Sequence, residues 1–489
     1  MPSSWTLSNA RIEPLSSSIG QPEALDLIRC GDGWGTDRVR AGCLIALLPF
    51  ALMSAPVYAQ VDAVVTVPPN IVLTNYDTVP VGPFGGLEGA AVVARVGDPS
   101  AAWFNPAGLA RQNTAQISGS AGVYQQTSIT PEALPNSGGS LQQLPNFVGV
   151  TFAVNPRITA GAALLTNNAW TQETDSELIS TVASGQQRFA YSADSDFERR
   201  VLAFGAGYHG DGPWRLGGGL AFSIMSLRLV QTASDRIGDS SGLKSLLVTA
   251  RASGSAIQLR SQAGAQYDTS QWRFGAAIRT PGLTLHRSGG VTLDGVLDAG
   301  ASSLGASVFD ADAAFEYHLP WEFQTGAAWL RDRFEVELDL DAFSSIAAYP
   351  LIATDKPAVI YGDAAAGRPP TIITQPFAGF TSASDGVFNV NAGGHVRLVN
   401  GRDVRLHAGV GNSQSPVAAD DMVFNRVDLV TWTLGLSGTF GKFQFAAGFN
   451  QQRGTANDVT LRNLLNGRVV QSAMDVRMSG FIYSLAYQF

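Results

Sequence analysis

The sequence predicts an all-β protein, a fourteen-stranded antiparallel transmembrane β-barrel. Three observations predict it: segments of about ten residues in which apolar and polar side chains alternate, short turns between them, and an export signal near the N-terminus. The chain contains no run of the roughly 20 consecutive apolar residues that a membrane helix needs. A helical membrane protein is therefore excluded.

Residues 1–59 form a predicted leader. The apolar stretch 41–57 follows two arginines and precedes small residues, so we expect a signal peptide that is cleaved after Ala59. Acidic residues ahead of the arginines are unusual for a signal peptide, and either a translation start nearer Val39 or a long leader would account for them. Both cysteines lie in the leader, so the exported chain has no disulfide.

The barrel is predicted to span residues 114–489. Six short turns separate its strands, at residues 154–157, 209–214, 268–271, 331–333, 400–403 and 440–442. Each turn joins two strands, and the first and last segments bring the count to fourteen, an even number as in closed bacterial barrels. Longer polar segments are expected to be loops on the other side, at residues 127–144, 172–187 and 347–385. This asymmetry places the short turns in the periplasm.

One strand, residues 334–343, shows which face meets the lumen. Apolar residues occupy one face and four carboxylates the other: Glu335, Glu337, Asp339 and Asp341. A charge facing lipid costs a few kcal/mol at mid-bilayer, so the carboxylates are expected to line the lumen. The next two strands carry further charged groups, which predict a charge ladder with these carboxylates: His395, Arg397, Arg405 and His407.

Aromatic residues beside the short turns and at the end of the chain indicate a membrane interface. They predict a girdle in contact with outer-membrane lipid and lipopolysaccharide. The final segment ends in alternating apolar residues and Phe489, similar to the terminal strand that the barrel assembly machinery of bacteria recognises. The expected location is therefore the bacterial outer membrane.

Several short motifs point to other functions but lack the context that those functions need. A GxGxxG spacing at residues 205–210 ends a predicted strand with no helix after it, and a GxSxG at 238–242 has no matching His and Asp. Residues 61–67 resemble an energy-coupling box, but the chain is too short for a 22-stranded transporter. The five histidines show no metal-ligand spacing. The sequence predicts no enzyme, cofactor or metal, and its net charge of −8 argues against nucleic acid as a partner.

The segment before the barrel, residues 60–113, does not alternate like a strand. Its part "GLEGAAVVARVGDPSAAWFNPAGLAR" resembles the start of the FadL-type family of outer-membrane transporters for long-chain fatty acids and aromatic hydrocarbons such as toluene. The positions that match the family pattern are Asp98, Asn105, Pro106, Ala107, Gly108 and Leu109. The resemblance implies a small helical hatch in the lumen. A surface hairpin before the first strand is the alternative.

The residues of this segment suit a hatch. Asp98 can cap a short helix, and Trp103 and Phe104 give that helix an apolar face. Pro106 would end the helix, and Gly108 would let the chain pass close to the barrel wall.

The resemblance implies passive uptake of hydrophobic small molecules by a monomeric plugged barrel. Release is expected sideways through the third strand, where Gly161, Asn167 and Asn168 mark the candidate opening. The lumenal carboxylates would repel a fatty acid unless Arg397, Arg405 or their neighbours compensate them, so an uncharged aromatic or alkane cargo stays open. Two other functions also stay open: a general polar porin, and a structural or adhesive barrel that acts through its loops.

Overall fold

The computed structural model describes most of the chain from residue 71 onward. The described residues are 71–73, 75–77, 79, 81–112, 114–131, 139–182, 185–239, 242–298, 303–362, 371–375, 377, 380–399, 403–418, 421, 424–462 and 469–489. The predicted leader, its cleavage site and the segment 61–67 lie outside them. Within this part of the chain, no helix is both long and apolar enough to cross a membrane.

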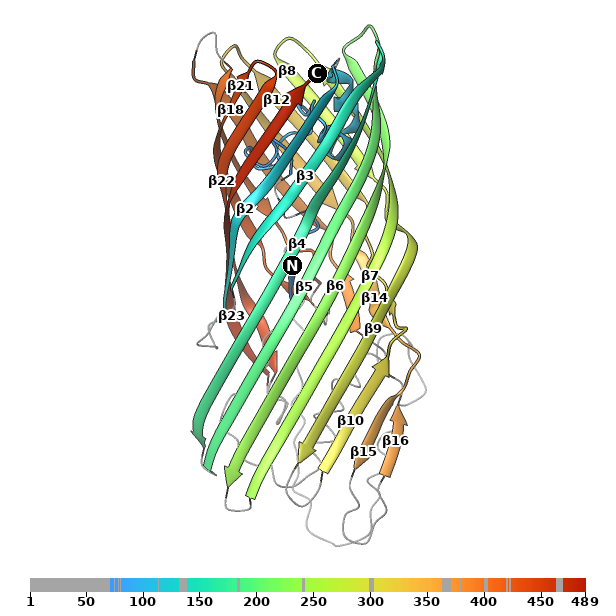
Figure 1. Cartoon of the computed structure of the whole chain (residues 1–489), viewed down its shortest axis with the longest axis vertical. Coiled ribbons are helices and arrows are strands. Elements are labelled where there is room, and N and C mark those ends of the chain that lie inside the picture. The colour runs from blue at the N-terminus through green and yellow to red at the C-terminus, as the bar shows by residue number, and fades with distance from the viewer. Residues whose placement is uncertain are drawn as a thin grey trace, which may run out of the picture. The chain divides into compact units, whose positions relative to one another are not determined.

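Antiparallel strands form a closed barrel that surrounds a short N-terminal segment (Figure 1). The barrel strands are β2 (Gln116–Pro131), β3 (Gly139–Asn155), β4 (Ile158–Val182), β5 (Gly185–His209), β6 (Trp214–Asp239), β7 (Gly242–Asp268), β8 (Trp272–Arg279), β9 (Leu283–Asp298), β10 (Ser303–Asp310), β12 (Glu322–Leu330), β13 (Phe334–Phe343), β15 (Ala358–Gly362), β16 (Thr371–Gln375), β18 (Val387–Arg397), β19 (Val404–Ser413), β21 (Leu429–Phe440), β22 (Phe443–Arg462) and β23 (Val469–Gln488).

These eighteen described strands occupy fourteen positions around the barrel. β7 pairs with β8 along one part of its length and with β9 along another, so β8 and β9 follow each other at one position. The same relation holds for β10 with β12, β13 with β15, and β16 with β18. β2 pairs with β23 and closes the barrel. The prediction of fourteen antiparallel strands is therefore confirmed.

Five of the six predicted short turns join two strands where the sequence placed them, and the sixth, at residues 400–403, lies mostly outside the described residues. The predicted loops are largely wrong. β4 and β5 extend through most of residues 172–187, and β2 and β3 enter the segment 127–144 from both ends. Alternation is weak in these polar stretches, which is why the sequence suggested loops. Of the GxSxG spacing, Gly238 belongs to β6 and Gly242 begins β7, while residues 240 and 241 lie outside the described residues.

A small inner sheet occupies part of the segment predicted as the longest loop. It consists of β11 (Ala314–Phe315), β14 (Ile346–Ala353) and β17 (Phe380–Ser384). Along the chain, β11 lies between β10 and β12, β14 between β13 and β15, and β17 between β16 and β18. A short parallel pair, β1 (Ile71–Leu73) with β20 (Phe424–Arg426), lies outside this sheet. The inner sheet packs into the lumen, since Phe315 is fully buried and lies against Gly254 of β7.

Apolar side chains divide between the outer face of the barrel and its lumen. On the outer face, exposed residues such as Val148, Leu220 and Phe445 form a surface suited to lipid. Inside, a large cluster of buried apolar residues joins the inner sheet to the long strands, including Trp170, Phe197, Met225, Phe315, Tyr317 and Leu351. This inner apolar cluster lies toward the long-strand end of the barrel, away from the short turns.

Candidate functional site

We call residues 81–112, which precede the first barrel strand, the hatch. The predicted hatch motif within them forms two short helices inside the barrel. α2 (Ala101–Phe104) is a single α-helical turn, and η2 (Pro106–Arg111) is a 3₁₀ helix. Asn105 separates them, and its side chain accepts a hydrogen bond from the Ala107 N–H, which caps η2. Pro106 therefore begins the second helix as well as ending the first, as a proline at the first helical position does.

Asp98 does not cap α2 as predicted. The N-cap residue is Ser100, whose side chain makes no capping hydrogen bond. Asp98 instead accepts hydrogen bonds from the backbone N–H and hydroxyl of Ser100, at 2.7 and 2.5 Å, and so closes the turn that leads into the helix. Burial raises the pKa of Asp98, and the bonds from Ser100 counteract that effect.

The apolar face of the hatch is buried against the wall. Trp103 and Phe104 are 2% and 7% exposed, and with Leu109 they pack on inward residues of β3 to β6, including Phe147 and Val201. The guanidinium carbon of Arg279 lies 3.9 Å from the Trp103 ring centre, a cation–π contact. The segment is therefore an internal plug and not a surface hairpin.

Close approach between hatch and wall depends on glycines of the wall. A Cβ added to Gly217 of β6 would lie 2.2 Å from the carbonyl carbon of Pro106, and one on Gly264 of β7 would lie 2.1 Å from the Asn105 side chain. Gly108, which was expected to face the wall, instead packs on Val96 of the hatch itself, where a Cβ would lie 2.3 Å from the carbonyl oxygen. The small residues that permit the approach belong to the barrel.

Polar wall side chains satisfy the backbone of the hatch. The Asp339 carboxylate accepts the N–H groups of Val92 and Val93, at 2.7 and 2.9 Å, and Thr433 donates to the Leu87 carbonyl at 2.7 Å. Since so little of the hatch is helical, its buried backbone groups would otherwise lack partners. Two further wall residues have the same role, Gln262 and Gln266.

The predicted lumenal carboxylates bind the hatch. Glu337 accepts the N–H of Ala94 at 2.5 Å and the side chain of Arg95 at 2.6 Å, and Glu335 lies 3.8 Å from the same guanidinium. Asp341 lies further along β13 and accepts from Asn391 at 2.8 Å. Arg95 was not singled out in the sequence, yet both Glu335 and Glu337 contact it.

The two arginines expected to compensate these carboxylates lie elsewhere. Arg397 is exposed and points toward the Asp332 carbonyl, at 3.5 Å, and Arg405 pairs with Asp403 at 2.6 Å. Their strands are nevertheless in the predicted ladder register, with Glu335 opposite His395 and His395 opposite His407.

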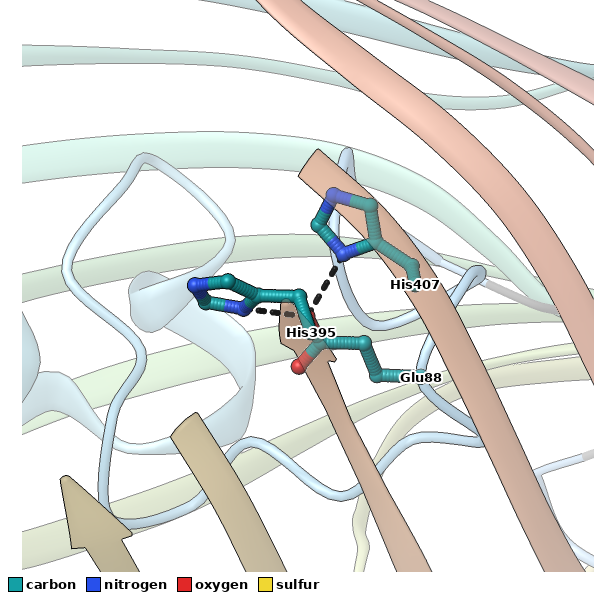
Figure 2. Close-up of side chains that lie close together, drawn as sticks. All are labelled: Glu88, His395 and His407. Carbon is teal, nitrogen blue, oxygen red and sulfur yellow. Dashed lines mark hydrogen bonds and ion pairs between the residues drawn. The ribbon is translucent and has the colours of Figure 1, made fainter. Parts of the chain in front are cut away.

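His395 of β18 and His407 of β19 meet Glu88 of the hatch (Figure 2). Both Nδ1 atoms lie within hydrogen-bond distance of the same Glu88 Oε1, at 2.9 and 2.7 Å, while Glu88 Oε2 binds Arg95 at 2.5 Å. Burial alone would raise the pKa of Glu88. Arg95 and the two imidazoles outweigh that effect and hold its pKa well below the usual range, so Glu88 stays ionised.

Two cavities flank the hatch. One of about 430 Å³ lies on the short-turn side and is lined by Glu88, Arg95, Glu335, His395 and Arg405 among others. The other, of about 100 Å³, lies between the hatch and the inner apolar cluster and is lined by residues that include Asp77, Trp103, Phe104, Asn167 and Asp341. The hatch thus separates a charged chamber from the apolar part of the lumen.

Three buried arginines lie between the hatch and the inner apolar cluster. Arg260 and Arg279 both pair with Glu322. Arg199 pairs with Asp77 at 2.9 Å and with the Asn167 side chain at 3.0 Å, and its Nη1 makes no hydrogen bond in the described part of the chain. These cations are not visible as a group in the sequence, because they come from three different strands.

The third strand of the barrel, β4, changes at the predicted position. Its pairing with β3 ends at Phe147↔Leu165, and a register shift between Thr166 and Asn168 leaves Asn167 as a bulge. Beyond Leu165, the described strands pair with β4 on its β5 side alone.

Both asparagines hold the N-terminal segment. Asn167 donates to Asp77 at 2.8 Å, and Asn168 donates to the Asn75 carbonyl at 2.7 Å. Gly161, the third residue predicted for this strand, lies nearer the short turns and contacts Leu109 of the hatch. A Cβ added to Gly161 would lie 2.7 Å from the leucine side chain.

Comparison with known proteins identifies similar folds. No family model matches the sequence, and no curated protein is significantly similar to it. Among solved structures, a Pseudomonas aeruginosa FadL homologue matches with a TM-score of 0.56 and 13% identity over 85% of this chain and 100% of its own. The Pseudomonas putida toluene transporter TodX matches with a TM-score of 0.53 and 13% identity over 85% and 99%. The Ralstonia pickettii toluene transporter TbuX matches with a TM-score of 0.50 and 14% identity over 84% and 98%.

The similarity covers nearly the whole of each solved chain. It matches the resemblance seen in residues 85–111 and the closed fourteen-stranded barrel. The chain has the fold of the FadL-type outer-membrane channels.

Proposed function

We propose that this protein is an outer-membrane channel for the passive uptake of hydrophobic compounds, either long-chain fatty acids or aromatic or aliphatic hydrocarbons. The observation that carries the proposal is the inner apolar cluster, a buried lumenal region that includes Phe197, Met225 and Tyr317 and is closed toward the short turns by the hatch. Each CH₂ of an apolar cargo moved from water into such a region gains about 0.8 kcal/mol. A lumen lined in this way favours apolar cargo over ions and sugars.

Lateral release through β4 is part of the proposal. From the Asn167 bulge onward, β4 has an edge with which no described strand pairs, and the hatch blocks the straight route to the short-turn end. A cargo that leaves sideways would remain in contact with apolar surface. The N-terminal segment bound by Asn167 and Asn168 would have to shift first, since it lies across this point.

Mass spectrometry of the apolar compounds that co-purify with the barrel tests the proposal. Bound fatty acids, alkanes or aromatics would support it and would name the cargo class. Deletion of the protein should also slow growth on that compound. Unchanged uptake of all three classes would contradict the proposal.

Arg199 provides a way to distinguish the two cargo classes. Its Nη1, which has no hydrogen-bond partner among the described residues, lies in the buried layer between the hatch and the inner apolar cluster, where it could bind a carboxylate head group. Arg199→Gln should weaken fatty-acid binding and leave alkylbenzene binding unchanged if the cargo is a carboxylate. Equal effects on both ligands would favour a hydrocarbon cargo.

The polar porin and the adhesive barrel predict different results. A porin would give large, steady single-channel conductance in planar bilayers, whereas the plugged lumen should give little. An adhesive barrel would bind cells or matrix through its loops with no uptake defect. No observation in the described residues favours either function.

A further inference from the structure

We propose that Glu88, His395 and His407 form a binding site for a divalent transition-metal ion, best represented by Zn²⁺, that ties the hatch to the barrel wall. One potential ligand atom from each residue can be chosen so that all three lie within 4.8 Å of one another. The inference does not depend on which cargo the barrel carries.

The ligand atoms are of the kind and spacing that zinc uses. The Nδ1 atoms of His395 and His407 lie 2.9 and 2.7 Å from Glu88 Oε1. Zinc bonds of about 2.0–2.2 Å in a tetrahedral arrangement require ligand atoms roughly 3.3 Å apart. Each of the two Nδ1–Oε1 distances therefore needs to lengthen by about 0.4–0.6 Å to admit the ion, which side-chain rotation can provide.

A neutral imidazole can provide this ligand without losing its proton to solvent. In the hydrogen-bonded arrangement each Nδ1–H can donate to Glu88. When an ion takes the place of those hydrogens, the ring proton moves to Nε2 and Nδ1 coordinates through its lone pair. For His407 the Nε2–H then has an acceptor in place, because Ser437 Oγ lies 2.7 Å away.

The surroundings of His407 resemble those of a metal ligand. Metal-bound histidines usually donate their second ring nitrogen to an oxygen, which fixes the ring orientation. Ser437 supplies that oxygen, and the Phe84 ring stacks on the imidazole at 5.4 Å between centres and 21° between planes. His407 is fully buried and is therefore held in one orientation.

Three protein ligands leave a fourth position for water. Glu88 and His395 line the cavity of about 430 Å³ on the short-turn side of the hatch. An ion and its water can reach the site from that side without passing the apolar lumen. Zinc is also found with three protein ligands and a water in the fourth position.

Carboxylates lie close to the proposed ligand atoms, and two arginines oppose an incoming ion. Three carboxylates, Glu88, Glu335 and Glu337, lie within 4 Å of Arg95, so a single guanidinium serves all three, and Arg273 adds a weaker contact to Glu335 at 3.9 Å. Arg95 opposes an incoming ion, since its Nη1 lies 3.5 Å from His395 Nδ1. Arg405 lines the same cavity, and its charge acts on His407 as well. The charge of Arg95 is the nearer of the two to the proposed ligand atoms. Loss of this positive charge should therefore strengthen metal binding.

Titration calorimetry of chelator-treated, full-length protein in detergent with ZnCl₂ tests the site. We expect one Zn²⁺ per barrel, with affinity reduced by at least about a hundredfold in His395→Ala and His407→Ala, because each removes a direct ligand. His286→Ala is the matched control, since this histidine is exposed on β9, and it should bind like the wild type. The heat-modifiable gel shift of a folded barrel confirms assembly of each variant.

Two further variants separate a metal site from a general loosening of the hatch. Ser437→Ala should weaken Zn²⁺ binding by about 10–100-fold through loss of the second hydrogen bond of His407. Arg95→Gln should bind Zn²⁺ more tightly, whereas a variant that only loosened the hatch would bind it less.

Absence of Zn²⁺ binding to the wild type, or equal binding by the alanine variants, would overturn the proposal and leave a hydrogen-bonded contact between hatch and wall. If the alanine variants do not assemble, X-ray absorption at the zinc edge of the wild type decides. Two imidazole nitrogens among the zinc ligands would support the site. A zinc ion without imidazole ligands would overturn it.

Discussion

At the scale of single residues, two features of the wall hold the hatch: glycines that leave room for it, and polar side chains that bind its backbone. Gly217 and Gly264 leave room for Pro106 and Asn105, and Asp339 and Thr433 then reach the hatch backbone. These hydrogen bonds to the hatch backbone are needed because an unpaired buried backbone group costs about 1–3 kcal/mol.

Gly217→Val should displace the hatch while the barrel still forms. A Cβ at residue 217 would lie 2.2 Å from the carbonyl carbon of Pro106, and a small local movement of the backbone cannot relieve this clash. The neighbouring Gly218 faces outward, and its Cβ would lie 3.8 Å from the nearest atom, so Gly218→Val is the control. We expect increased ion conductance in planar bilayers for the first variant only. Equal conductance of the two variants would show that the position of Pro106 in the lumen does not depend on Gly217.

Asn105→Ala should loosen the hatch by removing three hydrogen bonds. The side chain accepts from the Ala107 N–H and donates to the carbonyls of Val93 and Ala265 at 3.0 and 3.2 Å. The expected loss in hatch docking is about 1–3 kcal/mol, since buried groups lose their partners. Ion leakage should rise with assembly intact. If assembly fails instead, the segment is required for folding and is not only a plug.

At the scale of elements, β4 is a long strand that loses one described neighbour partway along. It pairs with β5 over its whole length but with β3 only as far as Leu165. A bulge at Asn167 marks the change, and bulges commonly bend a strand and end its pairing.

Deletion of Asn167 should remove the bulge and let β4 continue in register. It also removes the contacts of that side chain with Asp77 and Arg199. We expect slower uptake of the hydrophobic cargo, measured with the labelled compound, and normal assembly. Asn167→Asp keeps the bulge residue while altering the contacts, and should therefore retain more transport than the deletion. Equal transport by wild type and deletion would exclude lateral release at this strand.

The sequence predicted those elements whose signal is local. Strands alternate over about ten residues, and the turns and the hatch motif are short, so the strand count and the position of the hatch followed from the residues near them. The inner sheet was missed because β11, β14 and β17 are short and pair across loops. Glu88 and Arg95 were missed because their partners lie more than 240 residues away, at Glu337 and His407. Such contacts leave no local pattern.

At the scale of the whole barrel, outward side chains show which part crosses the membrane. On β6 the exposed outward residues are apolar from Trp214 to Ile224 and polar from Ser226 to Arg236. On β5 the same change falls between Leu202 and Arg200. About 9–11 residues of a tilted strand suffice to cross a bilayer. The rest of these 25- and 26-residue strands therefore extends beyond the membrane on the long-loop side.

This position of the membrane can be tested with two substitutions on one face of β6. Leu220→Arg places a charge within the apolar band and should destabilise the inserted barrel by about 2–4 kcal/mol, measured by denaturant unfolding in lipid vesicles. Ser226→Arg adds the same charge on the same face, three outward positions beyond Leu220 and one beyond Ile224. It should cost less than about 1 kcal/mol because it lies near or outside the interface. If the two variants lose equal stability, the band is wrongly placed. The free edge of β4, which begins beside Val201 at the outer limit of this band, would then not open at the outer surface of the bilayer.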